Sequence, residues 1–258
     1  MDLNIAGLRV LVTAGAEGIG LEIARTFLRE GARVHVCDVD RAALDAAAAT
    51  HPDLTSSYGD VADRGDVARV FEEALSVLGG LDVLVNNAGI AGPTARVEEI
   101  DPEDWDRCLE VCITGQFNCT RLAVPHLRKS QNASIVNLSS AAGRFGFPLR
   151  SPYAAAKWAV IGFTKSLSRE LGEDGIRVNA ILPGVVAGDR QRRVLEAKAQ
   201  QLGVSFEEMQ GRALANTSLK EYVTAQQLAD QVVFLCSPLG RTISGQAIAI
   251  DADLQALF

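Results

Sequence analysis

The feature that most constrains the fold is a repeated alternation of short apolar segments with longer helical patterns. Seven apolar segments have strand character, at about residues 9–13, 33–38, 54–58, 81–85, 134–138, 177–182 and 246–250. The segments between them follow helical periodicity, and no hairpin turn joins two strands. Strands that alternate with helices form parallel sheets covered on both faces. The sequence therefore predicts an α/β fold with a doubly wound parallel sheet of about seven strands in three α/β/α layers.

Length and charge narrow the class of protein further. The chain has 258 residues, 48 % of them hydrophobic, and no linker or repeat, so we expect one domain over residues 1–258. A formal net charge of −7 argues against a nucleic-acid or an anionic membrane surface as the main partner. No run of about 18 apolar residues is present, and the first residues have no secretion-signal pattern, so we expect a cytoplasmic protein.

The five cysteines include no Cys-x-x-Cys pair, which fits a reducing compartment. Cys108, Cys112 and Cys119 can share part of one helical face, but no His, Asp or Glu completes a ligand set around them. We therefore predict no metal site and expect these thiols to be small core residues.

A glycine-rich loop lies between the first strand and the first helix. Gly15, Gly18 and Gly20 follow the strand that ends at Thr13, and a helical pattern begins at Leu21. Glycines let the backbone approach a pyrophosphate closely, and the N–H groups at the helix start receive its charge. This arrangement predicts a Rossmann-like nucleotide site.

An acid ends the second strand at the distance expected for a ribose-binding carboxylate. Asp38 follows Gly20 by eighteen residues. A carboxylate there repels a 2′-phosphate, Glu17 adds to the repulsion, and Val39 supplies no positive charge, so the sequence favours NAD over NADP. The alternative is that Asp38 caps the alanine-rich helix that follows.

Tyr153 and Lys157 are four residues apart and share a helical face. A nearby ammonium stabilises the phenolate, which lets a tyrosine exchange protons near neutral pH. Ser140, at the end of the fifth strand, can hold a substrate oxygen against the same tyrosine. Taken alone, the Tyr-x-x-x-Lys pattern also occurs on ordinary exposed helices, and it gains weight from the nucleotide site upstream.

Together these motifs resemble the short-chain dehydrogenase/reductase family over nearly the whole chain. The matching positions are Thr13, Gly15, Gly18, Ile19 and Gly20 in the glycine loop, Asp60 and Val61 at the adenine, Asn86, Asn87, Ala88 and Gly89 after the fourth strand, Ser140, Tyr153 and Lys157 at the catalytic group, and Pro183 and Gly184 at the nicotinamide turn.

The resemblance implies hydride transfer between NAD(H) and a secondary alcohol or ketone, with Tyr153 as the general acid or base. Lys157 would support the tyrosine and bind the nicotinamide ribose, and Ser140 would hold the substrate oxygen. It also implies a homotetramer or a homodimer, in which the apolar end of the chain could cross to a neighbour's active site. The implied cofactor contacts are Gly15, Glu17, Gly18, Ile19, Asp38, Asp60, Val61, Asn87, Ala88, Gly89, Tyr153, Lys157, Pro183 and Gly184.

Two positions depart from the family pattern. Ala14 replaces the first loop glycine, which is tolerable where the backbone avoids positive φ. Cys112 stands where the family usually has an asparagine that braces the active-site helix and helps to hold a water, and a thiol cannot replace an amide. Asn118 is about 240° further around the helix, so we do not expect it to substitute.

The segment of about residues 188–221 corresponds to the family's substrate lid. Arg190, Arg192 and Arg193 open this lid, and Arg144 and Arg150 flank the loop between Ser140 and Tyr153. One hypothesis is a substrate anion bound by one or more of Arg144, Arg150 and Arg190. The competing interpretation is a solvated lid helix whose arginines pair with Glu196, Glu207 and Glu208.

An apolar wall for the substrate pocket has four candidates, each of which could equally be a core residue: Phe145, Phe147, Trp158 and Leu182. Acyl, sugar, polyol, steroid and hydroxy-acid substrates all stay open.

Three functions compete at this point. The first is the NAD-dependent dehydrogenase or reductase. The second is a nucleotide-binding scaffold or sensor whose catalysis is impaired by the Cys112 replacement. The third is epimerisation or dehydration on the same site, which converts substrate without a net change in NADH.

Overall fold

The computed structural model describes residues 2–257, except for the side chain of Arg190. One seven-stranded sheet runs through it in the order β3-β2-β1-β4-β5-β6-β7, and every neighbouring pair is parallel. This confirms the predicted doubly wound sheet. Its strands are β1 (Arg9–Thr13), β2 (Arg33–Asp38), β3 (Thr55–Tyr58), β4 (Val83–Asn86), β5 (Ser134–Leu138), β6 (Arg177–Pro183) and β7 (Ala247–Ile250).

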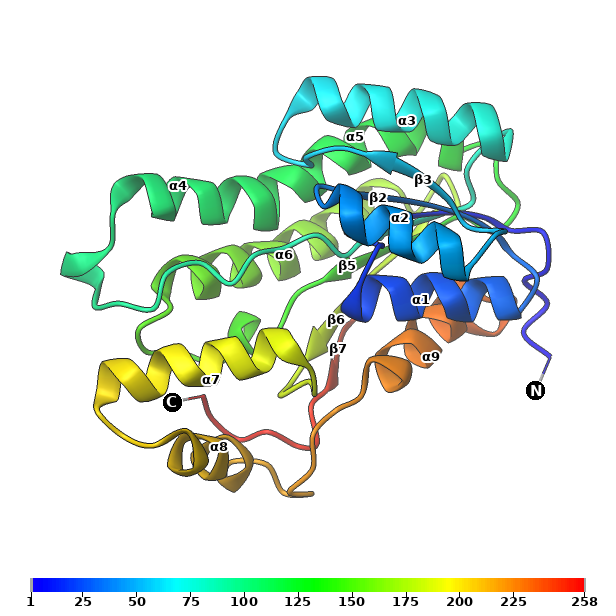
Figure 1. Cartoon of the computed structure of the whole chain (residues 1–258). Helices are drawn as coiled ribbons and strands as arrows, with labels where there is room; N and C mark the ends of the chain where they lie inside the picture. Colours follow the sequence, from blue (N-terminus) through cyan, green and yellow to red (C-terminus); the bar gives the residue numbers. More distant parts are fainter. Residues whose placement is uncertain (1, 258) are drawn as a thin grey trace.

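Helices cover both faces of the sheet, because alternate residues of each strand point to opposite sides (Figure 1). In β1, Val10 and Val12 join one core cluster, whereas Leu11 joins the other. The first cluster packs against α1 (Gly18–Arg29), α2 (Arg41–Thr50) and α9 (Ala225–Cys236). The second packs against α3 (Arg64–Leu78), α5 (Gly115–Leu127) and α6 (Ser151–Glu170).

The chain reverses its direction across the sheet between β1 and β4. From β1 it winds outward through β2 to β3 and then crosses back to β4 on the other side of β1. In open α/β sheets, ligands bind at the carboxyl ends of the strands beside such a reversal. The loops after β1 and β4 therefore mark where a ligand is expected.

The long helix predicted over residues 102–129 contains one irregular turn. It consists of α4 (Pro102–Leu109), a π-helical turn at Glu110–Thr114 and α5. The turn is closed by a bond from the Gly115 N–H to the Glu110 carbonyl, one residue wider than an α-helical bond. Such turns concentrate at functional sites, and this one carries Cys112.

Residues 189–215 form α7 (Asp189–Leu202) and α8 (Phe206–Ala215) beyond the sheet's edge (Figure 1). They pack on a lid cluster of buried residues that includes Leu195, Met209 and, from the segment after β7, Leu254. The sequence left open that the apolar tail reaches a neighbouring subunit, but Leu254 is buried within its own chain. Short 3₁₀ turns occur at Val97–Glu99, Ala141–Gly143 and Pro238–Gly240. Among residues 2–257, no helix combines the length and apolarity that crossing a bilayer requires.

Two buried polar chains run beside the sheet. His35 on β2 bonds the Thr55 and Ser57 hydroxyls at 2.9 Å each, and Ser57 in turn donates to Glu73. Burial lowers the pKa of His35 to about 4, although the charge of Glu73 opposes the shift. This histidine is therefore neutral in the folded protein near neutral pH.

The second chain crosses the sheet centre. The Asn86 amide nitrogen donates to Asn137 at 2.8 Å and to Thr120 on α5 at 3.1 Å. Asn137 donates to the hydroxyl of Thr164 on α6 at 2.9 Å. Asn86 and Asn137 are register partners on β4 and β5, so this chain links the two strands to the helices that cover them.

Candidate active site

The glycine loop folds tightly between β1 and α1. A Cβ added to Gly20 would collide with the Ala14 carbonyl oxygen and lie 2.5 Å from the Asn87 amide nitrogen, whereas one added to Gly18 would meet open space. Glu17 occupies the N-cap of α1 without a side-chain cap bond, and the first helical turn contains no acid. The N–H groups of that turn thus suit an anionic group.

Ala14 adopts a positive φ, the backbone conformation that the sequence analysis identified as unfavourable for alanine at this position. Its φ is +48°, in the left-handed region where a Cβ is strained. The steric strain that a Cβ causes at positive φ explains why the family has glycine at this position. In this chain the alanine destabilises the loop by roughly 1 kcal/mol.

Asn87 fastens the loop after β4 to the glycine loop. Its side-chain nitrogen donates to the carbonyls of Thr13 at 3.0 Å and Ala14 at 2.9 Å. The Thr13 hydroxyl accepts from the N–H groups of Asn87 and Ala88 at 3.0 Å each. The two loops beside the reversal thus form one rigid unit.

Asp38 faces the glycine loop rather than capping the helix after it. One carboxylate oxygen accepts from the Ala16 N–H and the other from the Asp40 N–H, both at 3.2 Å. The N-cap of α2 is Asp40, which accepts from Ala43 at 3.0 Å. Three residues after Asp38, the guanidinium of Arg41 stacks 3.9 Å from the Tyr58 ring centre; inspection of Val39 alone had missed this cation.

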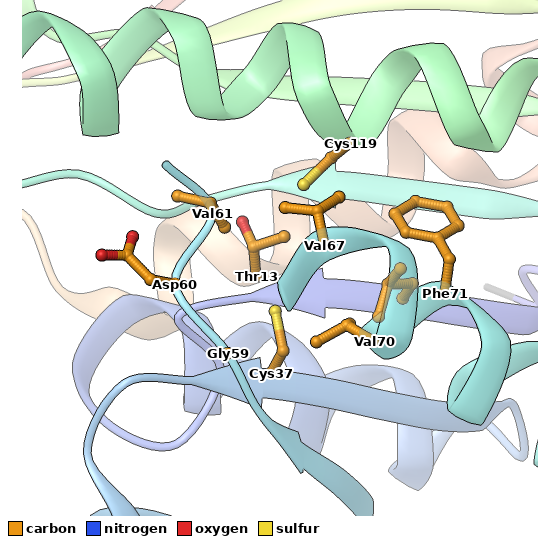
Figure 2. Close-up of a pocket in the computed structure, with 10 residues that line it drawn as sticks. Thr13, Cys37, Gly59, Asp60, Val61, Val67, Val70, Phe71 and Cys119 are labelled. Carbon is orange, nitrogen blue, oxygen red and sulfur yellow. The ribbon is translucent and has the colours of Figure 1, made fainter. Parts of the chain in front are cut away.

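The Asp60–Val61 segment is anchored from α5. Asn118 donates to the Val61 carbonyl at 3.0 Å, so it supports this segment and does not replace an amide at Cys112. The Asp60 carboxylate pairs with Arg107 at 2.5 Å. Figure 2 shows its side chain pointing away from a small apolar cavity behind the strand ends, which Cys37 and Val61 help to line.

The segment that directly follows β5 packs against α6 beside the Lys157 carbonyl. Ser139 donates to the Lys157 carbonyl at 2.7 Å, and a Cβ on Gly143 would approach that same carbonyl at 2.7 Å. Ser140 begins the short turn at Ala141–Gly143 and accepts from the Ala142 N–H at 3.1 Å. The hydroxyl of Ser140 is therefore held at the sheet edge next to the helix that carries Tyr153.

Lys157 is buried and its ammonium donates to the Leu138 carbonyl at 2.8 Å. The same nitrogen lies 5.6 Å from the centre of the Tyr153 ring. The guanidinium carbon of Arg150, three residues before Tyr153 in the chain, lies 5.3 Å from the same ring centre. The phenol ring thus lies between two cationic side chains.

Cys112 borders this group from the π-helical turn. Its thiol donates to the Ile90 carbonyl at 3.4 Å. A Cβ on Gly89 would lie 3.3 Å from the Lys157 nitrogen and 3.5 Å from the Cys112 sulfur. The Gly89 backbone therefore lies close to both the lysine ammonium and the thiol. A hydrogen bond to Cys112 and burial raise the pKa of Cys108.

Pro183 and Gly184 end β6 beside the last strand. Gly184 donates to the Ile250 carbonyl at 3.0 Å, and a Cβ there would lie 2.5 Å from the Cα of Asp251. Asp251 pairs with Arg144 at 2.7 Å. The charge of Arg144, one of three arginines expected at the substrate, is thus matched within the fold.

The lid holds a buried cation that sequence reasoning missed. Lys198 on α7 is 1 % exposed, and its nitrogen lies 4.1 Å from the Phe147 ring centre. It lines a cavity under the lid together with Phe147, Val185 and Leu254. Lys198 follows Leu195 by three residues and adjoins Ala199, and because both are buried, helical spacing places Lys198 on the buried face of α7.

Two arginines of the lid form ion pairs at the surface, unlike the buried Lys198. Arg192 pairs with Glu196 at 2.8 Å while 70 % of its side chain is exposed, as in the solvated-helix interpretation. Arg212 pairs with Glu208 at 2.5 Å on α8. Arg190 lies on α7, but its side chain is outside the described part of the structure.

All five cysteines are buried thiols, as expected for core residues. Burial raises the pKa of Cys37 to about 12 and that of Cys236 to about 11. Such thiols stay protonated and unreactive near neutral pH. Within residues 2–257, leaving aside the Arg190 side chain, no three His, Cys, Asp or Glu side chains converge as a metal site would require.

The chain is similar to known oxidoreductases over nearly its full length. A family model described as enoyl-(acyl carrier protein) reductase matches residues 13–253. The 2-(S)-hydroxypropyl-CoM dehydrogenase 3 of Xanthobacter autotrophicus is 34 % identical over 253 residues, which cover 96 % of either chain.

Solved structures agree with these matches. A variant of the actinorhodin polyketide ketoreductase with NADPH superposes with a TM-score of 0.91 at 32 % identity, over 95 % of this chain and 96 % of its own. The NAD+-bound xylitol dehydrogenase does so with a TM-score of 0.92 at 26 % identity, over 96 % and 98 %. The chain belongs to the short-chain dehydrogenase/reductase family, whose members bind a nicotinamide cofactor.

Proposed function

We propose that this protein is an NAD(H)-dependent oxidoreductase that interconverts a secondary alcohol and a ketone. The observation that carries the proposal is the placement of the Tyr153 ring 5.6 Å from a buried ammonium, that of Lys157, at the edge of the sheet where the glycine loop lies. That arrangement supplies a phenol able to exchange a proton, next to a site for a nucleotide.

The residues present fit a nicotinamide cofactor. The space beside Gly18 and the N–H groups at the start of α1 suit its pyrophosphate, and Asp38 suits its adenosine ribose. Further contacts are proposed from Gly15, Glu17, Ile19, Asp60, Val61, Asn87, Ala88, Gly89, Pro183 and Gly184. When bound, the cofactor supplies the hydride carrier.

The protein's own groups handle the proton. Tyr153 would take the proton from the alcohol oxygen in oxidation and return it in reduction, while Ser140 holds that oxygen. A lysine ammonium has three donors, so the bond from Lys157 to Leu138 leaves others for the phenolate and the cofactor ribose.

The preference for NAD over NADP rests on Asp38. Its carboxylate lies within hydrogen-bonding distance of the glycine loop, where a 2′-phosphate would meet a negative charge. We expect NADH to bind more tightly than NADPH by about 10-fold or more, the size of one charged hydrogen bond. Asp38→Ser should remove much of the preference for NADH over NADPH, because Arg41 is nearby and can then attract the 2′-phosphate. The double variant Asp38→Ser with Arg41→Ala lacks that cation and should not gain affinity for NADPH in this way.

The first test is a fluorescence titration with NADH and NADPH, followed by a screen of NAD reduction over alcohols, sugars and hydroxy acids. Tyr153→Phe should lower kcat by roughly 1,000-fold and keep NADH affinity, because general acid–base groups contribute about 10²–10⁴. Substrate conversion without a net change in NADH would instead indicate epimerisation or dehydration.

Cys112 favours one alternative, a nucleotide-binding scaffold or sensor. Its thiol donates to a carbonyl and offers no amide to brace the helix or hold a water. If NADH binds tightly and no alcohol turns over across the screen, this alternative replaces the enzyme. Turnover by wild type that Tyr153→Phe abolishes would exclude it.

We also propose a cytoplasmic homotetramer or homodimer. Phe117 on α5 and Trp158 on α6 are 43 % and 53 % exposed, and large apolar side chains in such positions suit a subunit interface. Trp158, one of the four apolar residues considered for the substrate pocket, is thus assigned to the interface instead. Light scattering would determine the subunit number, and Trp158→Glu should lower it.

A further inference from the structure

A buried glutamine joins α5 to the end of β5. Gln116 is 2 % exposed, and its side-chain nitrogen donates to the Leu138 carbonyl at 3.3 Å. The opposite orientation of the amide would bring two carbonyl oxygens together, so this contact fixes which end of the amide faces the strand. Leu138 is the last residue of β5 and follows Asn137, the last β5 residue in register with β4. Its carbonyl is therefore open to side-chain donors.

The same carbonyl anchors the candidate catalytic lysine. The Lys157 ammonium donates to it at 2.8 Å, and the lysine nitrogen lies 5.6 Å from the centre of the Tyr153 ring. A carbonyl oxygen has two lone pairs, so it can accept from the ammonium and from the amide together. Gln116 thus contacts the group that holds Lys157, and Lys157 in turn lies beside Tyr153.

The other end of the glutamine amide is unsatisfied. In the described part of the chain, residues 2–257 without the Arg190 side chain, the Gln116 Oε1 atom is buried and has no hydrogen-bond partner. A buried acceptor without a donor disfavours folding, and an apolar side chain of similar size avoids that loss. Packing alone therefore favours methionine or leucine at position 116. A glutamine that is unfavourable for stability points to a role in activity.

Gln116 also lies one helical turn beyond Cys112. The two residues are four apart, share one face and are both buried. Cys112 presents a thiol to the Ile90 carbonyl in the segment after β4. Gln116 presents an amide to the end of β5, the other strand end beside Lys157. This face of the helix therefore reaches the site with an amide, although not at Cys112.

We propose that Gln116 is a positioning residue of the candidate active site, whose amide orients the Leu138 carbonyl so that this carbonyl holds the Lys157 ammonium beside Tyr153. This rests on the proposed function and adds a residue to its site. A lysine side chain has many rotamers, and a fixed acceptor confines its ammonium. In this role the glutamine acts through Leu138 and Lys157.

Gln116→Met tests the role, because methionine has a similar length and no amide. For alcohol oxidation, kcat should fall roughly 10-fold with little change in KM, a part of the roughly 100-fold that a misplacement of about 1 Å can cost. The midpoint of the pH–rate profile should move to higher pH, because an ammonium held less firmly stabilises an anionic proton acceptor less. The melting temperature should stay equal or rise. A lower melting temperature with the same loss of activity at every pH indicates a structural role and overturns the proposal.

Ser134→Ala is the matched control at the opposite end of β5. Ser134 is fully buried, so this variant also removes a buried polar atom, but away from Lys157. Its kcat and pH–rate profile should match those of the wild type, and an equal loss of kcat contradicts the assignment. Gln116→Leu repeats the test with a second apolar residue. If neither apolar variant folds, the glutamine is structural and the proposal is overturned.

A double-mutant cycle in NADH binding separates this proposal from the proposed function. NADH is titrated into the wild type, Gln116→Met, Lys157→Met and the double variant. Because Lys157 is proposed to bind the cofactor ribose, Gln116→Met should weaken binding roughly 3- to 10-fold, the size of about one hydrogen bond. It should add no loss where Lys157 is already replaced. Unchanged affinity in Gln116→Met, or an additive loss in the double variant, overturns the role of Gln116. Tight NADH binding without turnover by the wild type overturns only the enzyme, and absence of NADH binding overturns both.

Discussion

The proposed nucleotide end and the proposed substrate end of the candidate site are made in different ways. At the nucleotide end, the loops after β1 and β4 meet through backbone carbonyls, N–H groups and glycines, with Asn87 and Thr13 as fasteners. At the substrate end, long cationic side chains from α7 and from the start of α6 converge on Phe147. The first arrangement is local and rigid, and the second depends on elements far apart in the chain.

The two ends also differ in their buried titratable groups. His35, in the nucleotide half, is neutral between hydroxyl groups. Under the lid, burial first and then the charge of Arg150 lower the pKa of Lys198 to about 7. A site for a constant cofactor can rely on backbone shape, whereas selection among substrates falls to side chains that substitution can change.

The largest expected effect is at the nucleotide end. Gly20→Ala places a methyl group on the Ala14 carbonyl, and overpacking against backbone costs about 3 kcal/mol or more, so NADH affinity should fall by at least roughly 100-fold. Gly162→Ala on α6, where an added Cβ meets nothing within 4 Å, is the control and should slightly stabilise. Fluorescence titration and thermal melts of both variants check this. Unchanged NADH binding by Gly20→Ala would show that the close backbone approach at Gly20 does not shape the nucleotide site.

The neutral state of His35 predicts acid sensitivity. Its pKa is about 4 in the folded protein and 6.5 in an unstructured peptide, so its contribution to stability is complete above pH 6.5 and is lost as the pH falls toward 4. The loss amounts to about 3 kcal/mol, from about 1.4 kcal/mol per pH unit. Urea unfolding at pH 7 and pH 4 of wild type and His35→Gln measures it. Equal losses in both proteins would contradict the prediction.

The smallest effect concerns Ala14. Since its φ is +48°, Ala14→Gly should relieve strain and stabilise the protein by about 1 kcal/mol, less any entropy lost by the unfolded chain. Gly7→Ala, at φ +79° with open space around it, should destabilise by a similar amount. Denaturant midpoints of the two variants provide the comparison. A destabilised Ala14→Gly would show that the loop is not strained.

The sheet was predictable because each strand is a local pattern. The strands at Arg9–Thr13 and Arg33–Asp38 occur where the apolar runs placed them, and glycines or acids mark their ends. The π-helical turn at Glu110–Thr114 was not predictable, since helical periodicity over residues 102–129 is nearly the same with or without one wider turn. The positive φ of Ala14 likewise follows from the close approach of Gly20 and Asn87.

In the candidate site, too, the residues placed by local sequence patterns were predictable and those placed by tertiary packing were not. The positions of the nucleotide loop and of Tyr153 and Lys157 follow from short spacings within one element. The substrate end required knowledge of which lid residues turn inward: Arg192 is exposed and Lys198 is buried. The apolar residues Leu195 and Ala199 on either side of Lys198 indicated the buried face, but the surrounding charged residues obscured that pattern.

The amide chain from Asn86 to Asn137 has a mechanical consequence. A slip of one residue between β4 and β5 would shift Ser140 by about 3.3 Å relative to Gly89 and turn the asparagine of the slipped strand away from its partner. Productive transfer needs reacting atoms held within about 3–3.5 Å of one another. By penalising that slip, the two interior asparagines keep the segments that carry Ser140 and Gly89 at a fixed separation, as the proposed transfer would require.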